Sequence, residues 1–275
     1  MNIHMNRFAS MFLLSLIVLL GACGRGESER LVITGATTVA PLINEIAKRY
    51  EQQHPGLRID VQTGGSSRGI NDVRAGLADI GMSSRSLLPA EAEVLHQQPI
   101  ATDGLSLLVH ADNPLRAIDR DQVIAVFRGE IRNWQELGGD DAPITVINRA
   151  DGRSEVELMK TFFDLQPEDV AAQLISGENL HGILSVAGNP QAIIVMSLGH
   201  SEFEIAQGRR VRLLDYEGVE ATSANVAAGT YPLTRPLMLI TRPESTARVR
   251  DFIAYARSPA VHDLVQRQAY VPVAP

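Results

Sequence analysis

The chain has 275 residues, of which 45% are hydrophobic and 5% aromatic, and it contains one cysteine. This composition excludes a disordered or collagen-like chain, and the lone cysteine excludes a disulfide scaffold. The formal charge of −7 gives no sign of the basic patch that a nucleic-acid binder needs, so we expect no nucleic-acid partner.

The first 23 residues are typical of a bacterial export signal. Arg7 supplies a positive start, and the apolar run 11–20 is too short to span a bilayer, which takes about 20 residues. The run ends in Leu-Gly-Ala-Cys at 20–23, which resembles a lipobox. That resemblance implies a signal peptide over 1–22, a lipidated Cys23, a tether over 23–29 and a periplasmic or extracytoplasmic protein anchored to the membrane. The alternative is an ordinary signal peptide with an incidental cysteine.

Strand-like and helix-like patterns alternate along the remaining chain. Alternating or continuous apolar residues predict the strands, and apolar residues at helical spacing predict the helices. Pro41 suits a first helical turn, and Asp119 suits a helix cap. This alternation predicts an α/β fold with mainly parallel sheets, and the length favours two sheets side by side. The expected strands are 31–34, 57–63, 78–82, 144–148, 192–196 and 237–241, and the expected helices are 39–50, 70–77, 89–97, 120–127, 154–163 and 249–256.

Three turns between a strand and a helix carry hydroxyl groups or arginines. They lie at 35–38, 64–69 and 149–154, and Ser84 follows a fourth strand. A helix N-terminus has unpaired N–H groups and favours anions. Taken singly, each turn is better explained as an ordinary helix cap. Since ligands bind where the carboxyl ends of such strands meet, the set together predicts an oxyanion site.

Several motifs in this order resemble the phosphate-binding proteins of ABC transporters. They are TGATTVAPL at 34–42, GGSSRG at 64–69, ADIGMSSR at 78–85, NRADGRS at 148–154 and GTYPLTRPL at 229–237. The resemblance covers essentially the whole chain after the signal. It implies a two-lobed periplasmic-binding-protein fold of type II, with strands crossing between the lobes near 104–109 and 230–240. Lobe 1 would comprise 30–106 and 232–275, and lobe 2 would comprise 107–231.

The same resemblance implies a binding protein without catalysis, cofactor or metal. Its ligand would be inorganic phosphate or a related oxyanion, its partner an ABC permease in the inner membrane, and its state a monomer. Thr37 and Thr38 would bind through hydroxyl and backbone N–H, and Arg149 would make the charged contact. Ser84 stands where some relatives carry aspartate and others serine. The full expected site is Thr37, Thr38, Ser66, Ser67, Ser84, Arg149, Gly152, Arg153 and Ser154.

The third motif departs from the family pattern. Arg153 and Glu155 stand where relatives usually have small donors. Arg153 can add a bidentate contact to an oxyanion. For Glu155 there are two hypotheses: it accepts the proton of hydrogen phosphate and so rejects sulfate, or it points away in the first helical turn, where acids are favoured.

Other functions remain open on sequence alone. The same fold serves equally well as a phosphate sensor or a cell-surface protein without transport. A remote alternative is a serine esterase, because residues 65–69 match G-x-S-x-G with Ser67 in the nucleophile position. The seven histidines show no metal-ligand spacing.

Overall fold

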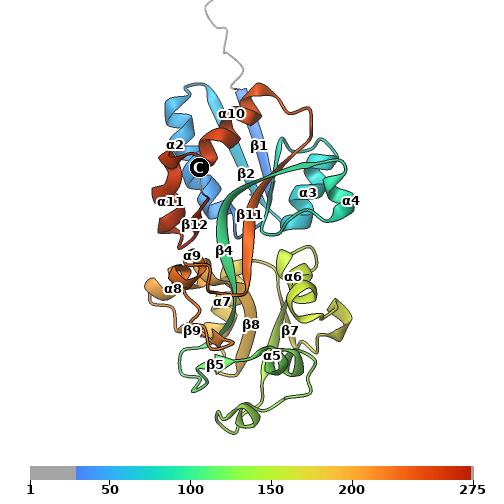
Figure 1. The fold of residues 1–275 in the computed structure, drawn as a ribbon, viewed down its shortest axis with the longest axis vertical. Coiled ribbons are helices and arrows are strands. Elements are labelled where there is room, and N and C mark those ends of the chain that lie inside the picture. The colour runs from blue at the N-terminus through green and yellow to red at the C-terminus, as the bar shows by residue number, and fades with distance from the viewer. Residues whose placement is uncertain (1–28, 274–275) are drawn as a thin grey trace, which may run out of the picture.

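A computed structural model describes residues 29–273. The expected signal peptide, Cys23 and most of the tether lie outside the described residues. The chain forms two α/β lobes, joined by two long strands that run from one lobe into the other (Figure 1). Within residues 29–273, none of the helices has the length and apolar character needed to cross a membrane.

Lobe 1 is built on three parallel strands. β1 (Glu29–Gly35) pairs with β2 (Leu57–Thr63) on one side and β3 (Ile80–Ser83) on the other. Buried apolar residues from the sheet and its helices, such as Ile33 and Phe252, form its main core. Its remaining elements are α2 (Ala40–Gln53), α3 (Ser66–Arg74), α4 (Pro89–Ala92), α10 (Ala247–Ala256), α11 (His262–Arg267) and β12 (Val271–Pro272).

Lobe 2 repeats this plan with a second parallel set. β6 (Thr145–Arg149) lies between β8 (Ala192–Ser197) and the edge strand β7 (Leu174–Ser176). Its main core includes Phe127 and Phe163. The other elements are α5 (Arg120–Phe127), α6 (Ser154–Phe163), α7 (Asn179–Ala187), α8 (Leu198–Ala206), α9 (Ser223–Ala227), β9 (Val211–Leu213) and the short pair β5 (Ala117–Ile118) and β10 (Asp215–Tyr216).

Two antiparallel strands connect the lobes. β4 (His96–His110) pairs with β11 (Thr234–Thr241) as far as Gly104, and from Leu105 onward it pairs with β8 of lobe 2. One continuous strand therefore belongs to both sheets. The mainly parallel, two-lobed fold expected from the sequence is confirmed.

Local expectations are mostly confirmed, with two corrections. Pro41 lies in the first turn of α2, and Asp119 caps α5 by accepting from the Gln122 amide at 2.8 Å. The helix expected over 89–97 ends at Ala92, because the residues from His96 onward extend to pair with β11. Helix α3 ends at Arg74, and Leu77, expected on its apolar face, is 72% exposed in the following turn.

Candidate oxyanion-binding site

The carboxyl ends of strands from both lobes meet at a buried polar cluster. From lobe 1 come the turns after β1, β2 and β3, and from lobe 2 those after β6 and β7. The side chains are almost fully buried, which is unusual for hydroxyl and charged groups. The cluster comprises Thr37, Thr38, Ser66, Ser84, Asp103, Arg149, Ser154, Glu155, Ser176, Asn179 and Arg235.

Local hydrogen bonds hold the lobe 1 hydroxyls in place. The Ser66 hydroxyl accepts from the Ser84 amide at 3.1 Å, which ties the start of α3 to the end of β3. The Tyr270 hydroxyl donates to the Thr38 carbonyl at 2.9 Å. Burial raises the pKa of Tyr270, so this phenol keeps the proton that it donates. The C-terminal segment therefore fixes the threonine turn.

Polar contacts cross directly from lobe to lobe. The hydroxyls of Ser84 and Ser154 are 2.6 Å apart. The Asn179 carboxamide hydrogen-bonds to both threonines of lobe 1, at 3.0 Å and 2.9 Å. The Ser67 amide donates to the Gly152 carbonyl at 3.2 Å. The two lobes are thus in contact at this cluster through groups able to bind an anion.

Arg149 lies at the centre of the lobe 2 half. Its Nη1 donates to the Ser176 hydroxyl and the Glu178 carbonyl, both at 3.3 Å. Its Nη2 donates to the Gly177 carbonyl at 3.1 Å and to Asn179 at 2.7 Å. Burial lowers the pKa of Arg149, and the carboxylate of Glu155 opposes that effect.

Glu155 lies between two arginines. Its Oε1 is 2.8 Å from Arg235 Nη1, and its Oε2 is 3.5 Å from Arg149 Nε. Burial raises the pKa of Glu155, but the two arginines outweigh burial and bring it down to about 2. The carboxylate is therefore ionised at neutral pH. The side chain is 2% exposed, so the hypothesis that it points away in the first helical turn is wrong.

A second carboxylate completes the charge balance. Asp103 on β4 is 2.9 Å from Arg235, and it accepts from the Ser197 hydroxyl and the Gly199 amide at 2.7 Å and 3.0 Å. Arg235 on β11 thus lies between two acids, which hold its pKa above the ordinary value despite burial. Two arginines and two acids leave the cluster with no net formal charge.

The structure brings together six of the nine expected residues in the cluster: Thr37, Thr38, Ser66, Ser84, Arg149 and Ser154. Ser67 and Gly152 meet at its edge through their backbones. Arg153 donates instead to Glu178 at 3.0 Å, and its Nη1 is buried without a hydrogen-bond partner. Sequence reasoning did not select Asp103, Asn179 or Arg235. Only Arg235 had a signal, because it lies within the motif at 229–237.

Over residues 29–273, no histidine or carboxylate hydrogen-bonds the Ser67 hydroxyl, so the esterase alternative has no triad there. The same residues contain no group of three or more histidine, cysteine, aspartate or glutamate side chains arranged to hold a metal.

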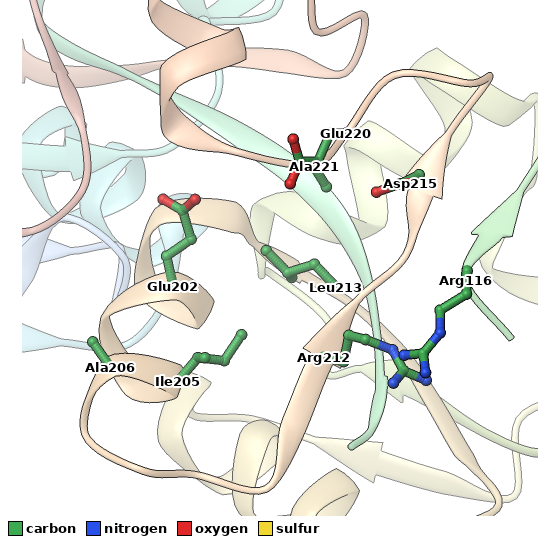
Figure 2. Close-up of a pocket in the computed structure, with 9 residues that line it drawn as sticks. All are labelled: Arg116, Glu202, Ile205, Ala206, Arg212, Leu213, Asp215, Glu220 and Ala221. Atoms are coloured by element: carbon green, nitrogen blue, oxygen red, sulfur yellow. The ribbon is translucent and has the colours of Figure 1, made fainter. Parts of the chain in front are cut away.

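A separate cavity of about 520 Å³ lies in lobe 2 beside α8 and β9 (Figure 2). Figure 2 shows the Arg116 and Arg212 guanidinium groups at one end and the acids Glu202 and Glu220 at the other. Arg212 already donates to the carbonyls of Ala111 and Leu115, at 2.9 Å and 3.0 Å. Its Nε is buried without a partner, but the lining carries three acids against two arginines, a balance that disfavours an oxyanion. The cavity lining is Arg116, Glu202, Ile205, Ala206, Arg212, Leu213, Asp215, Glu220 and Ala221.

The two lobes, the crossing strands and the polar strand ends between them define a two-lobed ligand-binding protein. Residues 22–260 match the family model described as a PBP superfamily domain. The chain therefore belongs to the PBP superfamily, the periplasmic binding proteins.

Curated relatives and solved structures agree with this assignment. The phosphate-binding protein PstS of Bacillus subtilis is 29% identical over 98% of this chain and 94% of its own length. A phosphate ABC transporter substrate-binding protein from Clostridium perfringens, solved with bound phosphate, is 30% identical with a TM-score of 0.84, over 90% of this chain and all of that one. An ABC-type phosphate transport receptor from Vibrio cholerae is 31% identical with a TM-score of 0.73, over 88% of this chain and all of that one. These relatives are binding proteins, and the chain is not an enzyme.

Proposed function

We propose that this protein captures inorganic phosphate outside the cytoplasm and presents it to an ABC importer. One observation supports the proposal most strongly: Thr37, Ser84 and Arg149 lie buried in one cluster, at the ends of strands from both lobes. The names of the relatives, which are phosphate-binding proteins of such transporters, support the choice of anion.

Capture needs no covalent chemistry. Serine and threonine hydroxyls and Arg149 replace the water around the anion, and closure of the lobes then excludes solvent. A hydrogen bond to a charged group contributes about 1.5–3 kcal/mol, and a micromolar complex requires about 8.2 kcal/mol. A handful of these donors is therefore sufficient. We propose that 30–106 with 232–275 and 107–231 move as the two bodies, and that the permease recognises the closed form.

Isothermal titration calorimetry tests this function. The chain from residue 24, stripped of bound anion, is titrated with phosphate at physiological salt. We expect binding at micromolar affinity or tighter, and its loss in Arg149→Ala. Arg212→Ala is the matched control, since Arg212 also holds lobe 2 carbonyls but lies away from the cluster. No phosphate binding by the folded wild type, or equal binding by Arg149→Ala, contradicts the proposal.

Glu155 supplies the specificity in this proposal. Its Oε1 is engaged by Arg235, whereas Oε2 has only a long contact to Arg149. An ionised carboxylate with a free acceptor site favours an oxyanion that carries a proton and repels one that carries none. Hydrogen phosphate has that proton at neutral pH and sulfate does not.

The Glu155→Gln variant tests the proton-reading role. We expect the ratio of phosphate to sulfate affinity to fall about 10- to 100-fold, because one hydrogen bond to a charged group is lost. The matched control is Glu178→Gln, which makes the same chemical change in the half-exposed partner of Arg153. A Glu155→Gln protein that keeps phosphate affinity and still excludes sulfate rules the role out.

A further inference from the structure

The side chain of Asn179 lies inside the proposed binding site, and the proposed function gives it no role. Asn179 is the first residue of α7 in lobe 2, and its side chain is buried at 3% exposure. Its Oδ1 accepts from the Thr37 hydroxyl at 3.0 Å and from Arg149 Nη2 at 2.7 Å. Its Nδ2 donates to the Thr38 hydroxyl at 2.9 Å. One carboxamide therefore engages three groups expected to bind the oxyanion.

The carboxamide oxygen takes the donors that an oxyanion oxygen would take. A hydroxyl O–H donor serves one acceptor at a time, so Thr37 cannot donate fully to both Asn179 and a ligand. Arg149 has few free N–H donors, because its other N–H groups already face Ser176, Glu155 and the backbone carbonyls of 177 and 178. An anion that binds Thr37 and Arg149 together must therefore displace the Asn179 oxygen.

The same contacts connect the lobes. Thr37 and Thr38 belong to lobe 1, whereas Asn179 and Arg149 belong to lobe 2, and both threonine contacts are side chain to side chain. A neutral amide offers less to a guanidinium than a charged oxyanion does, because the oxyanion adds the attraction of two opposite charges to the hydrogen bond. An oxyanion can therefore displace Asn179, but its net binding free energy is reduced by the free energy of the hydrogen bonds that it breaks.

We propose that Asn179 is an internal competitor of the oxyanion: its carboxamide holds Thr37, Thr38 and Arg149 together across the lobes until phosphate displaces it. The inference rests on the proposed function. Asn179 sets the affinity below what the donors alone would provide, and it shifts the unliganded protein toward the closed arrangement.

Two substitutions at this position test the proposal in opposite directions. Asn179→Ala removes the competitor, and we expect phosphate to bind about tenfold tighter by calorimetry, the equivalent of about one neutral hydrogen bond. Asn179→Asp places a charged competitor on Arg149, and we expect binding at least tenfold weaker. Asn71→Ala, on the exposed side of α3, is the matched control and leaves the affinity unchanged. Thermal melts verify that each variant folds.

Small-angle X-ray scattering of the anion-stripped proteins gives an independent measurement. We expect Asn179→Ala to have a larger radius of gyration than the wild type, and phosphate to abolish the difference. A wild type that binds phosphate, together with a folded Asn179→Ala that binds no tighter and is no more expanded, overturns the inference and leaves the proposed function intact. Failure of the wild type itself to bind phosphate overturns the proposed function instead.

Discussion

At the residue scale, two arginines from different parts of the chain stabilise the ionised carboxylate of Glu155. Arg149 ends β6, and Arg235 lies on the crossing strand β11. Removing one member of a buried ion pair leaves an uncompensated charge, which costs about 3–5 kcal/mol. Glu155 therefore contributes to folding as well as to ligand choice.

This contribution depends on pH in a defined direction. The pKa of Glu155 is about 2 in the folded protein, below its ordinary value of 4.5. A lowered folded-state pKa stabilises the fold above pH 4.5, and that stabilisation is lost as the pH falls toward 2. We predict that the free energy of unfolding of Glu155→Gln is lower than that of the wild type by about 3 kcal/mol at pH 7. This difference between the two proteins should become smaller below pH 4.5.

Urea unfolding of both proteins at pH 7, 4 and 3 measures this gap. Glu178→Gln is the control, since its half-exposed ion pair is worth at most about 1 kcal/mol. A gap between wild type and Glu155→Gln that stays constant from pH 7 to pH 3 would show that the carboxylate is not held ionised by the two arginines.

At the element scale, the turn between β2 and α3 brings the lobes close together. Gly65 has φ of +97°, and a Cβ atom there would lie 2.6 Å from the Gly152 carbonyl of lobe 2. Gly56 has nearly the same φ, +95°, with nothing within 4 Å of the same atom. The two glycines thus share a backbone requirement but only Gly65 lies against the other lobe.

We predict that Gly65→Ala and Gly56→Ala lose similar stability, about 1 kcal/mol each, from the left-handed backbone. Only Gly65→Ala should also weaken phosphate binding, by tenfold or more, because the methyl group obstructs closure. Thermal melts and calorimetry on both variants separate the two effects. Equal phosphate affinity in the two would mean that the lobes do not need this close approach.

Sequence predicted the elements whose pattern is local. The alternation over 57–63 matches β2, and the spacing over 154–163 matches α6. The helix predicted to open at Pro89 and reach residue 97 is shorter than expected, because the residues from His96 onward pair with β11, which is a tertiary effect. The site residues also differ in how far local sequence predicts them. Turn motifs identified Thr37 and Arg149, whereas Asp103 reaches the cluster only through the crossing of β4, which no local pattern encodes.

At the scale of the whole molecule, we propose that a lipid anchor holds the protein to a membrane. The lipobox-like sequence ending at Cys23 predicts a lipid anchor. We predict that the full chain partitions into the detergent phase of a Triton X-114 extraction and that Cys23→Ser moves it to the aqueous phase, with phosphate affinity unchanged. Detergent partitioning that survives Cys23→Ser would contradict lipidation at this residue.

The most direct test of the central claim is a crystal structure of the anion-stripped protein soaked with phosphate. We predict one phosphate between the lobes, within hydrogen-bond distance of Thr37, Ser84 and Arg149, with the Asn179 oxygen displaced from Arg149. Phosphate bound elsewhere, such as beside Arg116 and Arg212 in the lobe 2 cavity, or a cluster unchanged at saturating phosphate, would contradict it.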